Sequence, residues 1–287
     1  MFQQAKADRP QPASYLYMRH TLPVRVIHWI TVVSLTALLM SGLMIFNAHP
    51  SLAWGKSSNT GQPPVFEITA LRTSSGQWVG ITRLFSYQFD TTGVLGVSAG
   101  PNGQPAVIAF PSWLTIPARY SLAAGRLWHV FFAWMLMLNG VAYLAYALGS
   151  HHLQRKLLPA RPEWRGIGQS IRDHLRFKRP QGTAARHYNV LQKLSYLTVI
   201  FVLLPLIILT GWVMSPRLNA LWPGWGDAFG GRQSARTVHF AIAWLLVAFT
   251  AIHVFQVIVS GFWNHLRSMI TGRYRITGTP RKRKARP

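Results

Sequence analysis

Four long apolar runs alternate with polar segments along this chain. They cover about residues 24–46, 127–148, 194–214 and 237–262. An α-helix needs about 20 mostly apolar residues to cross the hydrocarbon core of a bilayer, and each run is long enough. Pro205 lies inside the third run, where a helix packed among neighbours tolerates it. The pattern predicts an all-α integral membrane protein, a bundle of four transmembrane helices.

The segment between the first two runs, about residues 47–125, has a different pattern. Short strand-like runs at 65–71 and 78–85 flank the turn-like sequence TSSGQ, and runs at 94–99 and 106–110 flank GPNGQ. Such spacing predicts two β-hairpins in a structured outer loop between the first and second helices. Together with the four spans, this insertion makes residues 1–287 one membrane domain.

The charge of the chain follows the spans. Of its 287 residues, 30 are Lys or Arg and only 6 are Asp or Glu. The basic residues gather in the terminal segments and between the second and third runs, which indicates membrane topology rather than nucleic-acid binding. The positive-inside rule predicts a multi-pass membrane protein with both termini in the cytoplasm, which in a bacterium is a protein of the inner membrane. The basic tail is then expected at anionic lipid headgroups.

The chain has no cysteine. This excludes disulfides, thiolate metal sites, iron–sulfur clusters and covalent attachment of haem through a C-x-x-C-H sequence. Any haem must therefore be held non-covalently.

Histidines inside the apolar runs are the candidate ligands. His239 and His253 lie fourteen positions apart in the fourth run, so they share one helix face about 21 Å apart along the axis. His28 lies in the first run and His129 in the second. A histidine within a membrane span is costly, which makes each of them a functional-site hypothesis.

Three of these histidines follow an arginine by three positions. The pairs are Arg25–His28, Arg126–His129 and Arg236–His239. At this spacing both side chains share a helix face, with the arginine one turn nearer the water. The arrangement suits a metalloporphyrin, with imidazole on the iron and guanidinium on a propionate, whereas zinc needs four ligands at one point.

Depth in the membrane assigns the four histidines to two haems. The cytoplasmic side has His28 and His253, and the outer side has His129 and His239. Gly42 follows His28 by fourteen positions and Gly140 follows His129 by eleven. Each glycine would give room for the other haem. A lone membrane histidine is more often a helix-to-helix hydrogen-bonding residue, but four at two matched depths favour two b-type haems.

The layout resembles a known family. Histidines on the first, second and fourth helices, two of them on the fourth, are similar to the bacterial cytochrome b561 and nickel-hydrogenase-type cytochrome b superfamily. The sequences PVRVIHW, SGLMIFNAHPSLAWG, FPSWLTIP and LAAGRLWHVFFAW resemble the thiosulfate-reductase-type branch of cytochrome b subunits. The resemblance implies haem ligation by the four histidines and a periplasmic molybdopterin oxidoreductase as partner. The insertion departs from the minimal family layout.

These observations predict a dihaem electron-transfer subunit linking the quinone pool to a periplasmic redox partner. No group of catalytic residues is evident, since Glu67, Asp90 and Asp227 are isolated in outer loops. Candidates for handling the quinone proton are His20, His151 and His265. Two alternatives stay open: a self-sufficient superoxide or ferric-chelate oxidoreductase, and a transporter whose histidines relay protons.

Overall fold

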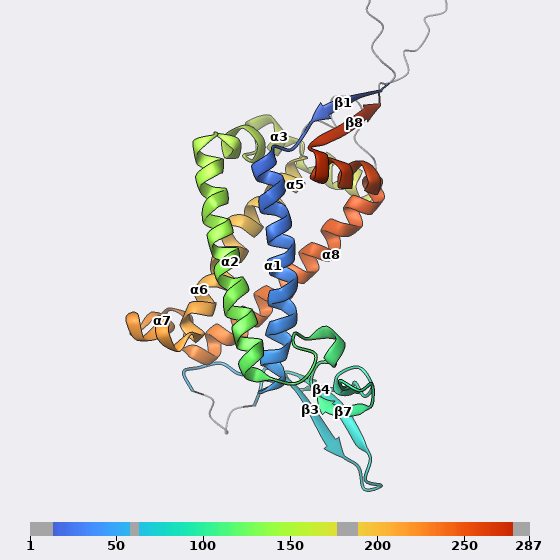
Figure 1. Cartoon of the computed structure of the whole chain (residues 1–287), viewed down its shortest axis with the longest axis vertical. Helices are drawn as coiled ribbons and strands as arrows, with labels where there is room; N and C mark the ends of the chain where they lie inside the picture. Colours follow the sequence, from blue (N-terminus) through green and yellow to red (C-terminus); the bar gives the residue numbers. More distant parts are fainter. Residues whose placement is uncertain (1–13, 58–62, 177–188, 278–287) are drawn as a thin grey trace, which may run out of the picture. The chain divides into compact units, whose positions relative to one another are not determined.

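Four long helices carry the apolar runs in the computed structural model, which describes residues 14–57, 63–176 and 189–277 (Figure 1). They are α1 (Leu22–Asn47), α2 (Leu122–Gly149), a third span over Val190–Met214, and α8 (Arg232–Thr271). Each is long and apolar enough to cross a membrane. The prediction of four such helices is confirmed.

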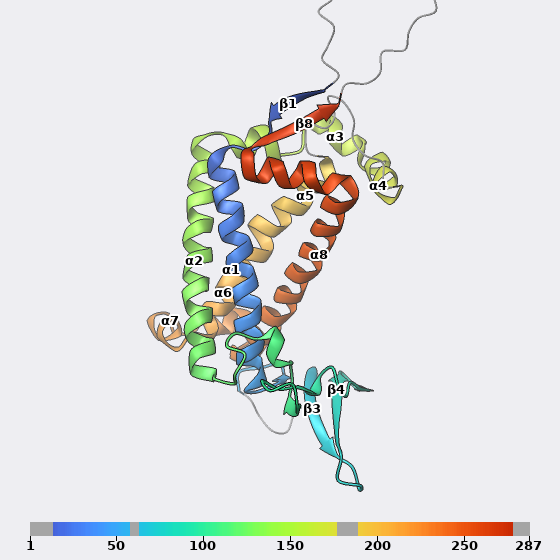
Figure 2. The same cartoon turned by 45° about the vertical axis from the view of Figure 1, so that its right-hand side comes forward.

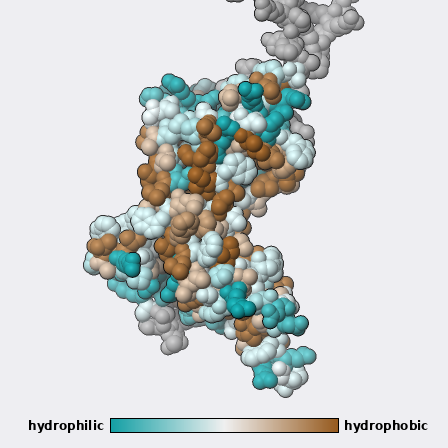
Figure 3. All heavy atoms as spheres, in the orientation of Figure 1, coloured by the Kyte–Doolittle hydropathy of each residue, from teal (hydrophilic) through white to brown (hydrophobic). Residues whose placement is uncertain are grey.

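Apolar side chains are exposed along these helices. Leu127 on α2 is 74% exposed and Val33 on α1 is 55% exposed. Figure 3 shows hydrophobic residues at the surface over much of the helical part. Contiguous exposed apolar surface is unfavourable in water but is accommodated by lipid tails, which accords with a membrane protein.

The third span is irregular around its proline. It consists of α5 (Val190–Thr198), the π-helical segment η4 (Val199–Leu203) and α6 (Leu204–Met214). Pro205, in the first turn of α6, has no N–H to donate to the preceding turn. The wider π-helical segment η4 directly precedes α6. The span therefore continues through the proline.

The fourth span is interrupted at Gly261, where φ is 113° and ψ is 78°. Only glycine adopts such angles readily, so the helix bends there (Figure 1). The membrane-length part of α8 thus ends close to the boundary predicted at residue 262. A shorter helical part leads on to β8 (Arg273–Thr277).

The insertion between α1 and α2 contains strands. The strands β2 (Ser51–Leu52), β3 (Phe66–Arg72), β4 (Trp78–Leu84) and β5 (Tyr87–Asp90) form an antiparallel sheet in the order β2-β3-β4-β5. The strands β6 (Gly96–Ala99) and β7 (Pro105–Ile108) form a second pair, followed by the short helix η1 (Ser112–Leu114). The turns after β3 and β6 lie at TSSGQ and GPNGQ.

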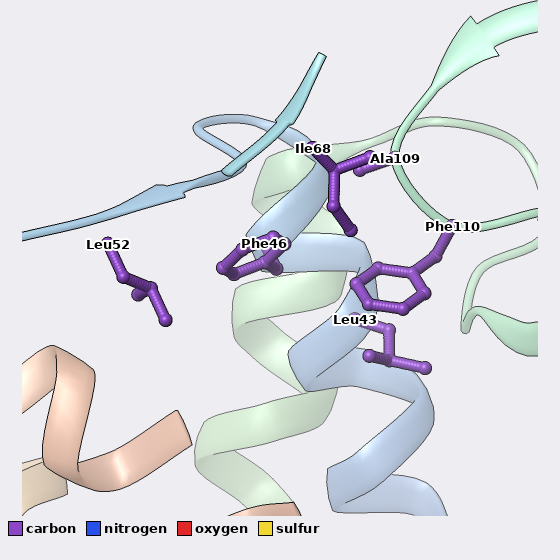
Figure 4. Packing of buried hydrophobic residues seen from close by; sticks show 6 residues of the cluster. All are labelled: Leu43, Phe46, Leu52, Ile68, Ala109 and Phe110. Carbon is purple, nitrogen blue, oxygen red and sulfur yellow. The ribbon is translucent and has the colours of Figure 1, made fainter. Parts of the chain in front are cut away.

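A small apolar core joins the insertion to α1 (Figure 4). Its buried members are Leu43 and Phe46 of α1 with Leu52, Ile68, Ala109 and Phe110 of the insertion. Phe240 of α8 stacks on Phe46 with ring centroids 4.9 Å apart. Burying the Leu, Ile and Phe side chains of this core, each worth about 1.5–3 kcal/mol, holds the insertion against the end of α1.

Two loops connect the later spans. The loop after α2 contains the π-helical turn η2 (Leu153–Leu157) and the helices α3 (Arg161–Arg165) and α4 (Ile167–Leu175). Lys193 of α5 is bound to Glu163 of α3 by an ion pair of 2.8 Å. The loop before α8 contains α7 (Pro216–Leu221) and η5 (Trp225–Phe229).

The chain divides into two compact units. One comprises residues 1–26, 143–198 and 250–287, and the other comprises residues 27–142 and 199–249. In the first unit, β1 (Ser14–Met18) pairs antiparallel with β8, so segments from the two ends of the sequence lie side by side (Figures 1 and 2). That residues 1–287 act as one membrane domain stays a prediction. The basic tail expected at lipid headgroups lies outside the described residues.

Candidate haem site

The imidazoles of His129 and His239 meet inside the second compact unit. His129 is on α2 and His239 is on α8, and their ring centroids are 6.2 Å apart with the planes inclined at 57°. A metal–imidazole bond is about 2 Å long, so two rings ligating one iron from opposite sides have centroids about 6 Å apart. The spacing of these two residues therefore fits axial ligation of a single haem iron.

Each of the two imidazoles has a hydroxyl partner on a neighbouring helix. Ser41 Oγ of α1 is 3.1 Å from Nδ1 of His129. Thr210 Oγ1 of α6 is 3.0 Å from Nδ1 of His239. Both hydroxyl residues are fully buried. The Nδ1 atoms are thus engaged by the protein, which leaves the Nε2 atoms for a metal.

Glycines give the imidazoles room. A Cβ atom added to Gly42 would lie 3.4 Å from Cε1 of His129, and one added to Gly211 would lie 3.5 Å from Cε1 of His239. Each ring therefore packs against the backbone of a neighbouring helix. An added Cβ at Gly140 would have no atom within 4 Å.

Sequence reasoning singled out Gly42 but missed Ser41, Thr210 and Gly211. The signal was a hydroxyl residue followed directly by glycine, which occurs once in the first span and once in the third. The third span has no histidine, so the sequence pattern alone predicts no ligand from it. Its contribution is the threonine–glycine pair beside His239.

The three arginines differ in their surroundings. Arg236 donates hydrogen bonds to the carbonyl oxygens of His49 and Ser51, the latter at 3.0 Å, and its guanidinium lies over the ring of Phe46. These bonds hold the start of α8 to the insertion. Arg126 is exposed and makes no hydrogen bond or ion pair within the described part of the chain. Its guanidinium is therefore available for a propionate.

Arg25 and the remaining two histidines lie elsewhere. Arg25 donates a hydrogen bond to the carbonyl oxygen of Ile270, near the end of α8. His253 has the ring of Tyr196 beside it, with centroids 6.4 Å apart. His28 and His253 belong to different compact units. Their pairing on one haem stays a prediction.

Glu67, Asp90 and Asp227 have polar partners other than the four histidines. Glu67 forms an ion pair with Arg83 at 2.7 Å, and Asp227 forms one with Lys56 at 2.7 Å. Asp90 accepts hydrogen bonds from Thr92, which lower the pKa of its carboxyl. Among the described residues there is no group of three or more His, Cys, Asp or Glu that could hold a bare metal ion. The geometry suits paired histidines on a porphyrin iron.

Comparison with known proteins identifies the family. The model of the prokaryotic cytochrome b561 family matches residues 19–272. The chain belongs to this family. Cytochromes of the family bind b-type haem, so this cytochrome b561 is a transmembrane haem protein with a role in electron transport. The family resemblance drawn from the sequence is confirmed.

A curated relative gives a second likeness. This cytochrome is 28% identical over 245 residues to the "Putative protein-methionine-sulfoxide reductase subunit YedZ1" of Azospira oryzae. The alignment covers 84% of this chain and 91% of the relative. No solved structure matches the chain.

Proposed function

We propose that this cytochrome b561 holds two b-type haems and transfers electrons between the quinone pool and a periplasmic redox partner. The observation that carries the proposal is the 6.2 Å separation of the His129 and His239 rings, each with Nδ1 bound by a buried hydroxyl. His129 and His239 hold the outer haem, and His28 and His253 hold the inner one. When bound, the haem irons supply one-electron transfer between their ferrous and ferric states.

The residues around the outer pair bind and orient the group. Ser41 and Thr210 fix the rings, Gly42 and Gly211 let them approach the helices, and Arg126 reaches a propionate from the exposed start of α2. Arg236 mainly holds the insertion against the start of α8, since its guanidinium donates hydrogen bonds to two backbone carbonyl oxygens of the insertion. Arg25 and Gly140 belong, in this proposal, to the inner haem.

The proposed orientation places both termini in the cytoplasm of a bacterium, with the protein in the inner membrane. Four spans return the chain to its starting side, and the antiparallel pairing of Ser14 with Thr277 supports this because it joins the two ends. The exposed Arg161 and Arg165 lie in the loop after α2, which is on the same side in this topology. The positive-inside rule assigns that side to the cytoplasm.

A molybdopterin oxidoreductase is the proposed periplasmic partner. The name of the Azospira oryzae relative describes it as a reductase subunit, which supports a role beside a separate catalytic chain. The insertion of the cytochrome lies in the same compact unit as the His129/His239 pair and packs against the start of α8. It is therefore the proposed docking surface next to the outer haem.

A quinone site is proposed in the first compact unit, near the inner haem ligand His253. There the ring of His265 lies 5.3 Å from that of Tyr274, and the Arg19 guanidinium lies 4.7 Å from the same tyrosine ring. His20, the residue after Arg19, is buried. His151 is instead exposed and bound to Gln154 at 2.9 Å. The geometry favours His265 for the proton that accompanies quinone chemistry.

The proposal is tested on the purified full-length protein. Quantified haem and a reduced-minus-oxidised spectrum should give two b-type haems per chain, and a quinol should reduce both. One haem per chain, or none, would contradict the dihaem arrangement. Rapid reaction with superoxide or a ferric chelate without any partner would instead favour the self-sufficient oxidoreductase.

A further inference from the structure

The two outer histidines are held by the same local device on two different helices. On α1 the pair is Ser41–Gly42, and on α6 it is Thr210–Gly211. In each pair the hydroxyl contacts Nδ1 of a histidine from another helix, while the glycine lies against Cε1 of the same ring. Each hydroxyl–glycine pair thus contacts the Nδ1–Cε1 edge of its imidazole.

The hydroxyl protons are already committed to the backbone. Ser41 Oγ donates to the carbonyl oxygen of Ala37 at 2.6 Å, and Thr210 Oγ1 donates to that of Leu206 at 2.8 Å. A hydroxyl has a single proton to donate but two lone pairs with which to accept. The contacts at 3.1 and 3.0 Å therefore require Nδ1–H of each histidine to be the donor.

A neutral imidazole with its proton on Nδ1 has its lone pair on Nε2. The backbone carbonyls of Leu38 and Ile207 also accept hydrogen bonds from His129 and His239, respectively. The buried hydroxyls act together with these carbonyls to favour the tautomer that a haem iron needs and to fix the rotation of each ring. A hydrogen bond from Nδ1–H also increases the basicity of the ligating nitrogen. A more basic ligand favours ferric over ferrous iron. The same hydrogen bond would therefore lower the reduction potential of a haem iron bound by Nε2 of that imidazole.

We infer that Ser41 and Thr210 are positioning residues that hold His129 and His239 in the iron-binding tautomer and lower the potential of the outer haem. This inference rests on the proposed function, because it takes the two histidines as ligands of one haem. The glycines have the complementary part. Without a side chain at Gly42 and Gly211, the Nδ1–Cε1 edge of each ring reaches the hydroxyl at hydrogen-bond distance.

The variants that test this are Thr210→Val, which keeps the shape of the side chain, and Ser41→Ala. Each should raise the midpoint potential of one haem, changing its ferric-to-ferrous equilibrium constant by about three- to tenfold, where tenfold is about 59 mV for one electron. The haem affected is the one that His129→Ala removes. Thr210→Ser keeps the hydroxyl and should keep the wild-type potential.

Matched controls are available on α1. Thr36 is exposed and donates to the carbonyl oxygen of Val32 at 2.9 Å, so Thr36→Val removes the same type of bond with no histidine involved. Ser34 is fully buried like Ser41, and Ser34→Ala removes the same atom from the same helix. Neither control should move the potential of the outer haem. The electron paramagnetic resonance signal of its ferric form should change only in the Ser41 and Thr210 variants.

The results separate this inference from the proposed function. If Ser41→Ala and Thr210→Val keep two haems per chain with unchanged potentials and resonance signals, the inference is wrong and the dihaem function stands. An equal shift in Thr210→Ser and Thr210→Val would also overturn it, because the hydroxyl would not be the cause. If His129→Ala and His239→Ala retain both haems, the ligand assignment fails and the inference falls with it.

Discussion

His129 and His239 face each other at 6.2 Å between ring centroids, although they come from the second and the fourth membrane spans. Neither ring is anchored by its own helix alone, since the hydroxyl contacts come from α1 and α6. All four spans thus contribute to one site. A bilayer-embedded bundle can hold a pair of imidazoles in this way without any charged group between them.

The first prediction concerns this pair. His129→Ala and His239→Ala should each remove the same b-type haem, because one axial ligand cannot replace the other, and should leave the second haem in place. Haem quantification with a redox titration of each variant measures this. His28→Ala and His253→Ala serve as the comparison and should remove the other haem. A different haem lost from the two outer variants would contradict the pairing.

Much of the fold was predictable from the sequence because it depends on the lengths of the apolar runs and on the positions of the basic residues between them. The four spans follow from residue patterns within single segments. The same patterns place His129 and His239 at similar distances from their helix starts, which accords with the 6.2 Å between the two rings. The roles of Ser41, Thr210 and Gly211 did not follow, because they depend on which helix faces which. The bonds from Arg236 to His49 and Ser51 were hidden for the same reason. The spacing of an arginine one turn from a ligand histidine predicts a propionate contact. It does not reveal whether loop carbonyls will bind the same guanidinium instead.

The second prediction separates Arg126 from Arg236. Arg126→Gln should raise no folding problem, since the side chain is exposed, but should lower the potential of the outer haem by removing a positive charge near a propionate. Arg236→Gln should instead loosen the insertion, because two carbonyl oxygens lose their donor. Redox titration reports the first effect and limited proteolysis of the insertion reports the second. Equal redox shifts without any change in proteolysis would contradict this division.

The third prediction concerns the glycines beside the rings. A methyl group at Gly42 would make ordinary van der Waals contact with His129, so Gly42→Ala should retain the outer haem. Gly42→Leu should displace that ring and lower the affinity for the outer haem by at least about tenfold, the scale on which disturbed ligand support lowers metal affinity. Gly140→Leu is the control for this site and should reduce only the inner haem. Full occupancy of both haems in Gly42→Leu would show that the close approach is dispensable.

The fourth prediction places quinone chemistry at His265 rather than at His151. His265→Ala should slow quinol-driven haem reduction severalfold, with both haems retained, because the proton acceptor beside Tyr274 is lost. His151→Ala should have no effect, since that side chain is exposed and bound to Gln154. Stopped-flow reduction by a quinol measures both rates. Normal rates in His265→Ala and His20→Ala would direct the search to the outer face.

The last prediction concerns the surface of the insertion. Its strand β5 is at the edge of the four-stranded sheet, and all four residues of this strand are exposed, with Tyr87 at 69% and Phe89 at 52%. An open edge with exposed aromatic side chains is a liability unless something covers it. In the proposed function the cover is the periplasmic partner.

Removing residues 61–103 would test the docking role, but the deletion also removes Ile68 from the core shown in Figure 4. Substituting exposed residues of β5 tests the same role without disturbing this core. Tyr87→Ser combined with Phe89→Ser should retain both haems and the fold of the insertion, while lowering co-purification of the partner and slowing electron transfer to it at least about tenfold, as loss of aromatic hot-spot residues does. Leu221→Ser combined with Trp222→Ser, at and just after the end of α7, removes comparable exposed apolar surface and should change neither. If the β5 variant exchanges electrons with its partner at the normal rate, docking does not use this edge.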